Sequence, residues 1–127
     1  MFKIDDETKL IELTRGDLAG INLSIEDYTF RANDKIQLNI YNARRMNTEP
    51  VFTKEWVVPE ATETFNIQLS SNDTKFGVMK SKPIDYWYEI QLNGNQTIIG
   101  FDDEINKDSK KGEKIFRLYP EGYVEEV

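Results

Sequence analysis

Apolar and polar residues alternate along much of this chain. In residues 21–25, 36–41 and 65–70 every second residue is isoleucine, leucine or phenylalanine, and the residues between them are mostly polar. Successive side chains of a β-strand point to opposite faces of the sheet, so each run predicts a strand with one buried and one solvated face. No segment of useful length has the helical period. The pattern therefore predicts an all-β fold.

Further segments are less regular but still favour strands, because they are rich in β-branched and aromatic residues. They are residues 2–5, 9–13, 51–58, 84–92, 97–101 and 115–119, which brings the total to about eight or nine strands. Within residues 84–92, the alternation places Ile84, Tyr86, Tyr88, Ile90 and Leu92 toward the core. It places Asp85, Trp87, Glu89 and Gln91 on the solvated face.

Turn residues separate these runs at intervals of roughly ten residues. Asn93-Gly94 is a strong hairpin signal, Arg15-Gly16-Asp17 predicts a turn, and Pro59 and Pro83 fall at strand ends. Residues 71–75 could form a single helical turn capped by Ser71. Such spacing indicates an antiparallel sandwich or barrel, and we favour a sandwich. No repeat or linker divides the chain, so residues 1–127 are expected to form one domain.

Two groups of residues are candidates for contact with a partner. The first is Trp87 with Asp85 and Glu89, because a large ring on the solvated face of a strand is either covered by a loop or exposed for binding. The second is the long, charge-dense segment 102–113, whose candidate contact residues are Asp102, Asp103, Lys107 and Lys110. The other large aromatic residues, Tyr28, Phe30 and Trp56, are predicted to fill the core.

Composition narrows the chemistry. The chain has no cysteine and no histidine, which excludes disulfides, thiolate chemistry, Ser-His-Asp triads and zinc sites built on these ligands. A net charge of −7 disfavours binding to nucleic acid. No apolar run reaches the roughly 20 residues of a membrane span. The first residues lack the pattern of a signal peptide, so we expect the protein to stay in the cytoplasm unless an assembly carries it out.

Carboxylates are the remaining candidates for chemistry. Glycoside hydrolysis needs two carboxyl groups facing each other across a cleft, and nothing in the sequence requires any two to converge. Asp102, Asp103, Glu104 and Asp108 could ligate calcium, but the interleaved lysines oppose a dication, and we interpret the segment as a hydrated, charge-balanced loop. Arg15-Gly16-Asp17 spells the integrin-binding tripeptide, but Gly16 has an ordinary turn role. We predict no catalytic residue, no cofactor and no metal site.

Several segments resemble small β-sandwich proteins of phages and prophages of Gram-positive bacteria. The resemblance lies in strand and turn residues rather than in an active-site motif. It is carried by residues 11–17 (IELTRGD), 21–25 (INLSI), 30–36 (FRANDKI), 64–69 (TFNIQL), 73–74 (DT), 87–92 (WYEIQL), 97–100 (TIIG) and 118–122 (LYPEG). The chain is similar to the N-terminal domain of the phage baseplate upper protein. That resemblance implies an immunoglobulin-like sandwich that docks into a tail baseplate.

The resemblance and the residues together predict a structural module of a phage tail or baseplate that acts by protein–protein contact, without catalysis. Its expected partners are other tail or baseplate proteins, or further copies of itself. Its expected location is the virion, or the host cytoplasm during assembly. The alternative is a carbohydrate-binding module, which would need two or more coplanar exposed rings, with Trp87 and a tyrosine as the expected pair.

Overall fold

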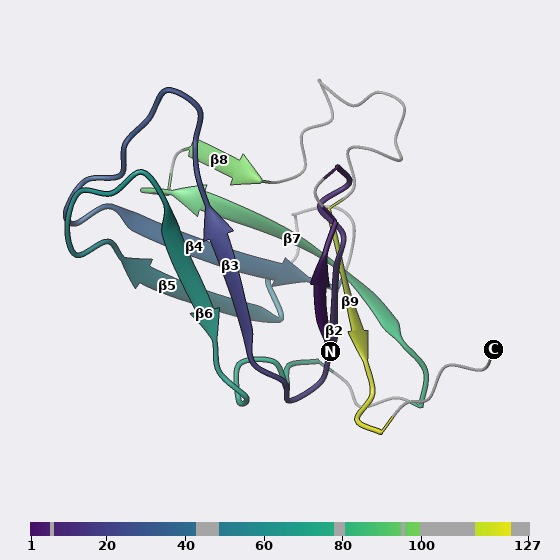
Figure 1. Ribbon diagram of the computed structural model, residues 1–127. Helices are drawn as coiled ribbons and strands as arrows, with labels where there is room; N and C mark the ends of the chain where they lie inside the picture. Colours follow the sequence, from purple (N-terminus) through teal and green to yellow (C-terminus); the bar gives the residue numbers. More distant parts are fainter. Residues whose placement is uncertain (6, 43–48, 78–80, 95, 100–113, 123–127) are drawn as a thin grey trace.

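The computed structural model describes residues 1–5, 7–42, 49–77, 81–94, 96–99 and 114–122, and these contain nine β-strands (Figure 1). The strands are β1 (Phe2–Ile4), β2 (Ile11–Thr14), β3 (Ala19–Leu23), β4 (Lys35–Tyr41), β5 (Phe52–Val57), β6 (Phe65–Leu69), β7 (Ile84–Leu92), β8 (Gln96–Ile99) and β9 (Ile115–Tyr119). Each of them overlaps one of the predicted runs. Over these same ranges, no helix has the length and apolar character needed to span a membrane.

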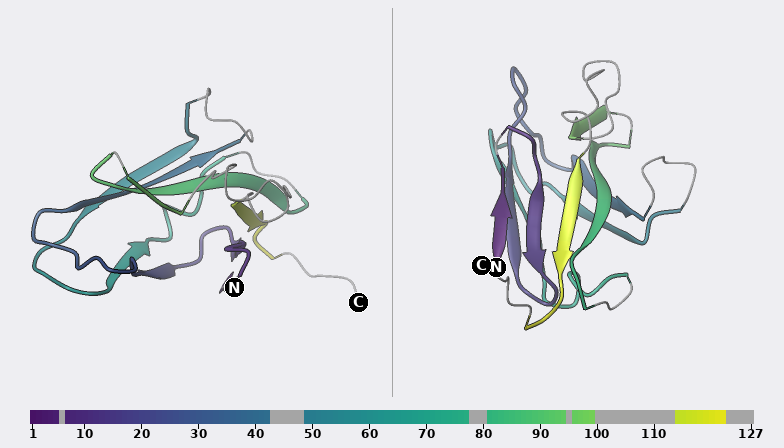
Figure 2. Two further views of the ribbon diagram at one scale, coloured as in Figure 1. Left: turned by 90° about the horizontal axis from the view of Figure 1, so that it is seen from above. Right: turned by 90° about the vertical axis from the view of Figure 1, so that its right-hand side faces the viewer.

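The strands form two layers. A seven-stranded sheet has the order β1-β2-β9-β7-β4-β5, with β8 also paired to β7, and the two-stranded sheet β3–β6 packs across it (Figures 1 and 2). The predicted all-β sandwich is therefore confirmed.

One pairing departs from the antiparallel expectation. Strands β2 and β9 run parallel, with Ile11 beside Phe116 and Thr14 beside Tyr119. The two strands lie near opposite ends of the chain, and the alternation of each strand specifies its two faces but not its neighbour. Local sequence therefore contained no signal for this pair.

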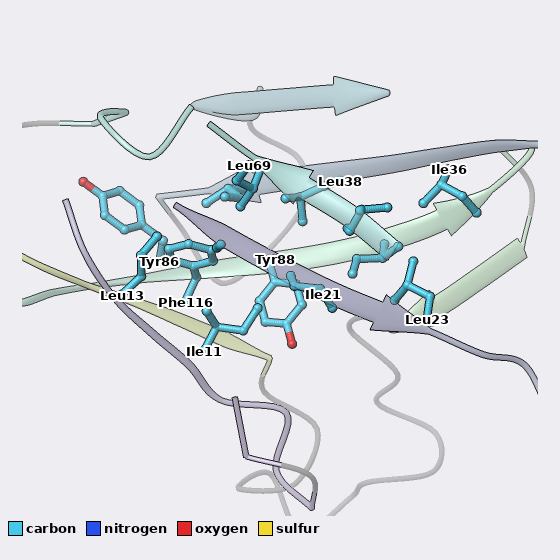
Figure 3. Packing of buried hydrophobic residues seen from close by; sticks show 14 of the residues in the cluster. Ile11, Leu13, Ile21, Leu23, Ile36, Leu38, Leu69, Tyr86, Tyr88 and Phe116 are labelled. Carbon is cyan, nitrogen blue, oxygen red and sulfur yellow. The ribbon is translucent and has the colours of Figure 1, made fainter. Parts of the chain in front are cut away.

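The core lies between the two sheets and is built from the alternating apolar residues (Figure 3). On β7 the predicted core face is confirmed, because Tyr86, Tyr88, Ile90 and Leu92 are all buried. The phenylalanine of β9, Phe116, meets the rings of Phe76 and Tyr88 edge-on, with centroids 5.4 and 6.4 Å away. Aromatic rings thus fill the middle of the sandwich.

The other aromatic predictions also agree with the structure. Phe30 is completely buried, and Tyr28 and Trp56 are partly buried and pack against the core. The rings of Tyr28 and Phe30 meet edge-on at a centroid separation of 5.9 Å.

Two local predictions need correction. The strand expected over residues 9–13 begins only at Ile11, because Lys9 has a left-handed φ of 62° and turns the chain. The short turn after β6 forms, but Ser70 caps it instead of Ser71: the Ser70 hydroxyl accepts from the Asp73 N–H at 3.2 Å. The Asp73 carboxylate in return accepts from the Ser70 N–H at 2.8 Å. This reciprocal pair resembles a capping box, so the cap lies one residue before the predicted Ser71.

The predicted hairpin at Asn93-Gly94 is confirmed. Both residues have left-handed φ angles, 53° and 75°, and they join β7 to β8. The side chain of Asn93 also connects distant loops, because its Oδ1 accepts from the Lys35 N–H at 2.9 Å and its Nδ2 donates to Asp34 at 3.2 Å.

Asp34 anchors the turn before β4. Its side chain is buried among three donors, namely the Arg31 N–H at 2.9 Å, the Tyr28 hydroxyl at 2.6 Å and the Asn93 amide. The Arg31 N–H and the Tyr28 hydroxyl hold the pKa of Asp34 below its usual value, against the opposing effect of burial. The ionised carboxylate is therefore the form that the folded protein prefers.

We expect Asp34→Asn to destabilise the protein at neutral pH by about 2 kcal/mol, because hydrogen bonds to a charged acceptor are lost or weakened. A lowered folded-state pKa stabilises the protein above the unfolded pKa of about 4, and this contribution disappears as the pH falls through the folded value. The stability difference between wild type and variant should therefore shrink as the pH falls from about 7 into the acid range below about 4. Urea unfolding across this range measures it, and a difference independent of pH would contradict the assignment.

Candidate interaction surface

The predicted contact residues of β7 lie on the outer face of the seven-stranded sheet, away from β3 and β6. Asp85, Trp87 and Glu89 alternate with the buried residues of the same strand. The strand register places Tyr41 of β4 beside Trp87, and Asn39 beside Glu89. On the opposite side, Ile115 and Arg117 of β9 lie beside Trp87 and Asp85.

The prediction that Glu89 is solvated is wrong. Only 3% of its surface is exposed, and its Oε1 accepts from the Asn39 amide at 3.0 Å and from the Tyr41 hydroxyl at 2.9 Å. A buried carboxylate needs such donors, because it would otherwise lose its hydration without compensation. Alternation correctly predicted that Glu89 points away from the core. On this part of the sheet, however, neighbouring side chains such as Asn39 and Tyr41 surround it and it is not exposed to solvent.

The hydrogen bonds around Glu89 continue across three strands. Asn39 accepts through Oδ1 from the Thr53 hydroxyl of β5 at 2.7 Å, and the Gln37 amide donates to the same hydroxyl at 3.3 Å. Burial, together with the hydrogen bond to Glu89, raises the pKa of Tyr41 to about 12. Tyr41 therefore remains a neutral donor at any physiological pH. We call Asn39, Tyr41, Thr53 and Glu89 the Glu89 network.

Asp85 belongs to a second polar group on the other side of Trp87. The Arg117 guanidinium donates to both of its carboxylate oxygens, at 2.7 and 3.2 Å. Tyr119 donates through its hydroxyl to Glu12 of β2, and this hydrogen bond raises the pKa of Tyr119. Asp85 itself remains exposed, as predicted. We call Glu12, Asp85, Arg117 and Tyr119 the Arg117 group.

Trp87 lies between the Glu89 network and the Arg117 group. Its side chain is partly buried, and its indole Nε1 is shielded from solvent with no hydrogen-bond partner among the residues that the structure describes. An unsatisfied buried donor costs about 1–3 kcal/mol. With Tyr41 on one side and Ile115 on the other, it forms a short row that crosses three strands. We call these three residues the Trp87 row.

The remaining predicted contact residues, Asp102, Asp103, Lys107 and Lys110, lie outside the described residues, as do the carboxylates considered as calcium ligands. Within the described ranges, no group of three or more acidic side chains is placed to hold a metal ion.

The Arg15-Gly16-Asp17 turn is held by the rest of the protein. Arg15 donates from Nη1 to the Phe76 carbonyl at 2.7 Å, and the Gly16 N–H donates to the Thr74 hydroxyl at 3.0 Å. Asp17 forms an ion pair with the N-terminal amine. Gly16 has a φ of 89°, which few other residues tolerate. These contacts agree with the interpretation as a structural turn.

A groove of about 580 Å³ lies on the other side of the molecule, at the ends of β3 and β6. Phe2, Leu18 and Leu69 line it together with Lys54. The ammonium group of Lys54 is paired with Asp73 at 2.5 Å, so this cation is already neutralised within the fold.

Sequence reasoning missed Asn39, Tyr41, Thr53 and Arg117 as parts of this surface. Their outward positions were visible in the alternation, but their neighbours depend on strand register, which a single sequence does not reveal.

Comparison with known proteins shows no relative. No family model matches the chain, and neither the curated proteins nor the solved structures contain a match.

Proposed function

We propose that this chain is a structural module of a phage or prophage tail or baseplate, and that it acts through protein–protein contacts without catalysis. The observation that carries the binding part of the proposal is Trp87, whose indole N–H is desolvated and unpaired among the described residues. Tryptophan is enriched at binding hot spots. A partner that supplies a carbonyl or carboxylate oxygen would satisfy this donor and cover the ring. The tail or baseplate assignment rests on the sequence resemblance alone.

The surroundings of Trp87 support this role. The Glu89 network and the Arg117 group hold the neighbouring strands by side-chain hydrogen bonds on both sides of the ring. A surface ordered before binding loses less conformational entropy when a partner docks. The proposed absence of catalysis is supported by the engagement of both carboxylates: Glu89 accepts two hydrogen bonds, and Asp85 is paired with Arg117.

Trp87→Ala is expected to weaken binding to phage particles or tail proteins by about tenfold or more, which corresponds to a hot-spot loss of about 1.4 kcal/mol or more. Co-sedimentation of the purified protein with particles induced from the bacterium that carries the gene measures this. Val57→Ala is a matched control, because Val57 is an exposed apolar residue of edge strand β5. Full binding by Trp87→Ala would contradict the role of Trp87.

A separate observation tests the biological assignment. If the neighbouring genes encode no tail or holin proteins, the phage proposal should be abandoned while the binding role of Trp87 stands.

Carbohydrate binding is the alternative, and a polysaccharide-binding assay with the same two variants tests it. Sugar rings stack on the exposed faces of aromatic side chains, and the ring nearest to Trp87 in the strand register, Tyr41, has only 7% of its surface exposed. The structure therefore favours a protein partner at this row. Binding to cell-wall polysaccharide that is lost in Trp87→Ala would instead support the carbohydrate-binding module.

A further inference from the structure

The smaller sheet has an open edge at β6. Strand β6 pairs with β3 on one side, from Leu69 beside Ala19 to Phe65 beside Leu23, and with no other strand that the structure describes. Its other edge therefore offers backbone N–H and C=O groups to an additional strand. This layer has only two strands, whereas the opposite layer has seven.

This edge lacks the features that usually prevent pairing between molecules. Proteins protect edge strands with charged residues, proline or bulges. Neither β3 (AGINL) nor β6 (FNIQL) contains a charge or a proline, and their register runs without a shift. By contrast, the edge strand β5 carries Lys54 and Glu55, and the edge strand β1 carries Lys3. Among the described edge strands, those of the smaller sheet thus lack the charges that β1 and β5 of the larger sheet carry.

The outward side chains of β6 suggest which strand would pair there. Asn66 and Gln68 are exposed neutral amides, each both a donor and an acceptor, so they complement another copy of themselves. A charged edge would instead select a partner of opposite charge. The corresponding positions of β3 are Gly20 and Asn22, and the glycine offers no side chain for such a match.

We propose that two copies of this chain associate through their β6 strands as an antiparallel pair about a twofold axis at Ile67. In such a pair, the apolar residues of one β6 strand must lie opposite the apolar residues of the other, so that both remain on the core face of the sheet. This condition is met only when the twofold axis passes beside a residue and not between two residues. Centring it on Ile67 aligns all five residues of the strand. Phe65 then lies opposite Leu69 of the partner, and Asn66 lies opposite the partner's Gln68. The two small sheets become one sheet of four strands.

Charge also favours this edge for self-association. The chain has a net charge of −7, so most surfaces of two copies repel each other. The neutral β6 strands bring no like charges face to face. Because a five-residue strand buries less area than a standard stable interface, we expect a weak dimer, with a Kd of about 10–1000 μM. This association uses neither the Trp87 row nor any phage component, so it is independent of the proposed function.

Sedimentation velocity of the purified chain from about 10 μM to 1 mM should show a monomer–dimer equilibrium. The double variants Asn66→Lys/Gln68→Lys and Asn66→Glu/Gln68→Glu should each raise the dimer Kd about tenfold or more, because like charges then face each other across the axis. Equimolar mixing of the two variants should restore a dimer that contains one copy of each, which native mass spectrometry distinguishes by mass. This recovery cannot arise from unfolded protein.

Asn22→Lys is the matched control. Like the double variants, it removes the 2.7 Å hydrogen bond that the Asn66 side-chain amide donates to Asn22. It also adds a positive charge to the same face of the sheet, but one strand away from the open edge. It should dimerise nearly as wild type does. The proposal is overturned if the wild type remains monomeric at about 1 mM, if it forms open-ended polymers, or if the mixed variants fail to pair.

Discussion

Phe116→Ala is expected to lower the free energy of unfolding by about 3–5 kcal/mol, one of the two largest effects that we anticipate for a single substitution. Phe116 is completely buried and lies where β9 crosses the middle of the core, in edge-on contact with Phe76 and Tyr88. Truncation would leave a cavity among rings that cannot collapse into it without losing their own contacts. Because a domain is stabilised by only about 5–15 kcal/mol, the variant should be close to unfolding at 37 °C.

Urea unfolding followed by tryptophan fluorescence measures this effect. Phe116→Leu serves as a control, because it retains most of the buried volume and should cost about 1.5 kcal/mol or less. Val57→Ala, at an exposed position, should change stability by less than about 0.5 kcal/mol. A loss below about 1 kcal/mol in Phe116→Ala would show that β9 does not contribute its ring to the core in solution.

Glu89→Ala is expected to cost about 2–4 kcal/mol, since it leaves the Asn39 amide and the Tyr41 hydroxyl buried without their acceptor. The effect should be larger than that of removing a solvated glutamate, which is usually within about 0.5 kcal/mol. Thermal or urea unfolding distinguishes the two values directly. The result decides whether this outward-facing carboxylate is part of the folded architecture.

The matched variant is Glu89→Gln. Its side-chain carbonyl can still accept from both donors, so it should retain much of the stability that Glu89→Ala loses. If Glu89→Gln were as destabilising as Glu89→Ala, the negative charge, rather than the two hydrogen bonds, would be the stabilising feature. A near-neutral Glu89→Ala would contradict the buried network itself.

Alternation alone placed the β7 residues of the candidate surface. The period of two placed Asp85 and Trp87 opposite the core residues of β7, and the structure confirms that they point outward. The same rule failed for Glu89, because it describes only the direction of a side chain. Whether an outward side chain meets water depends on what the adjacent strands place around it. Here Asn39 and Tyr41, some fifty residues earlier in the chain, contact it.

Local sequence patterns were sufficient to predict the class of fold and the approximate positions of the strands. Side-chain period, β-branched and aromatic residues, and turn residues such as Asn93-Gly94 act locally, so they are readable without any partner strand. The absence of histidine and cysteine likewise settled which catalytic groups the chain lacks.

Which strands are neighbours, by contrast, became known from the three-dimensional arrangement of the chain. The parallel pairing of β2 with β9, the hydrogen bonds that join Glu89 to β4, and the open edge of β6 all depend on contacts between residues far apart in sequence. Those contacts are selected by how the two layers bury their apolar faces together, a property of the whole chain that no local pattern contains.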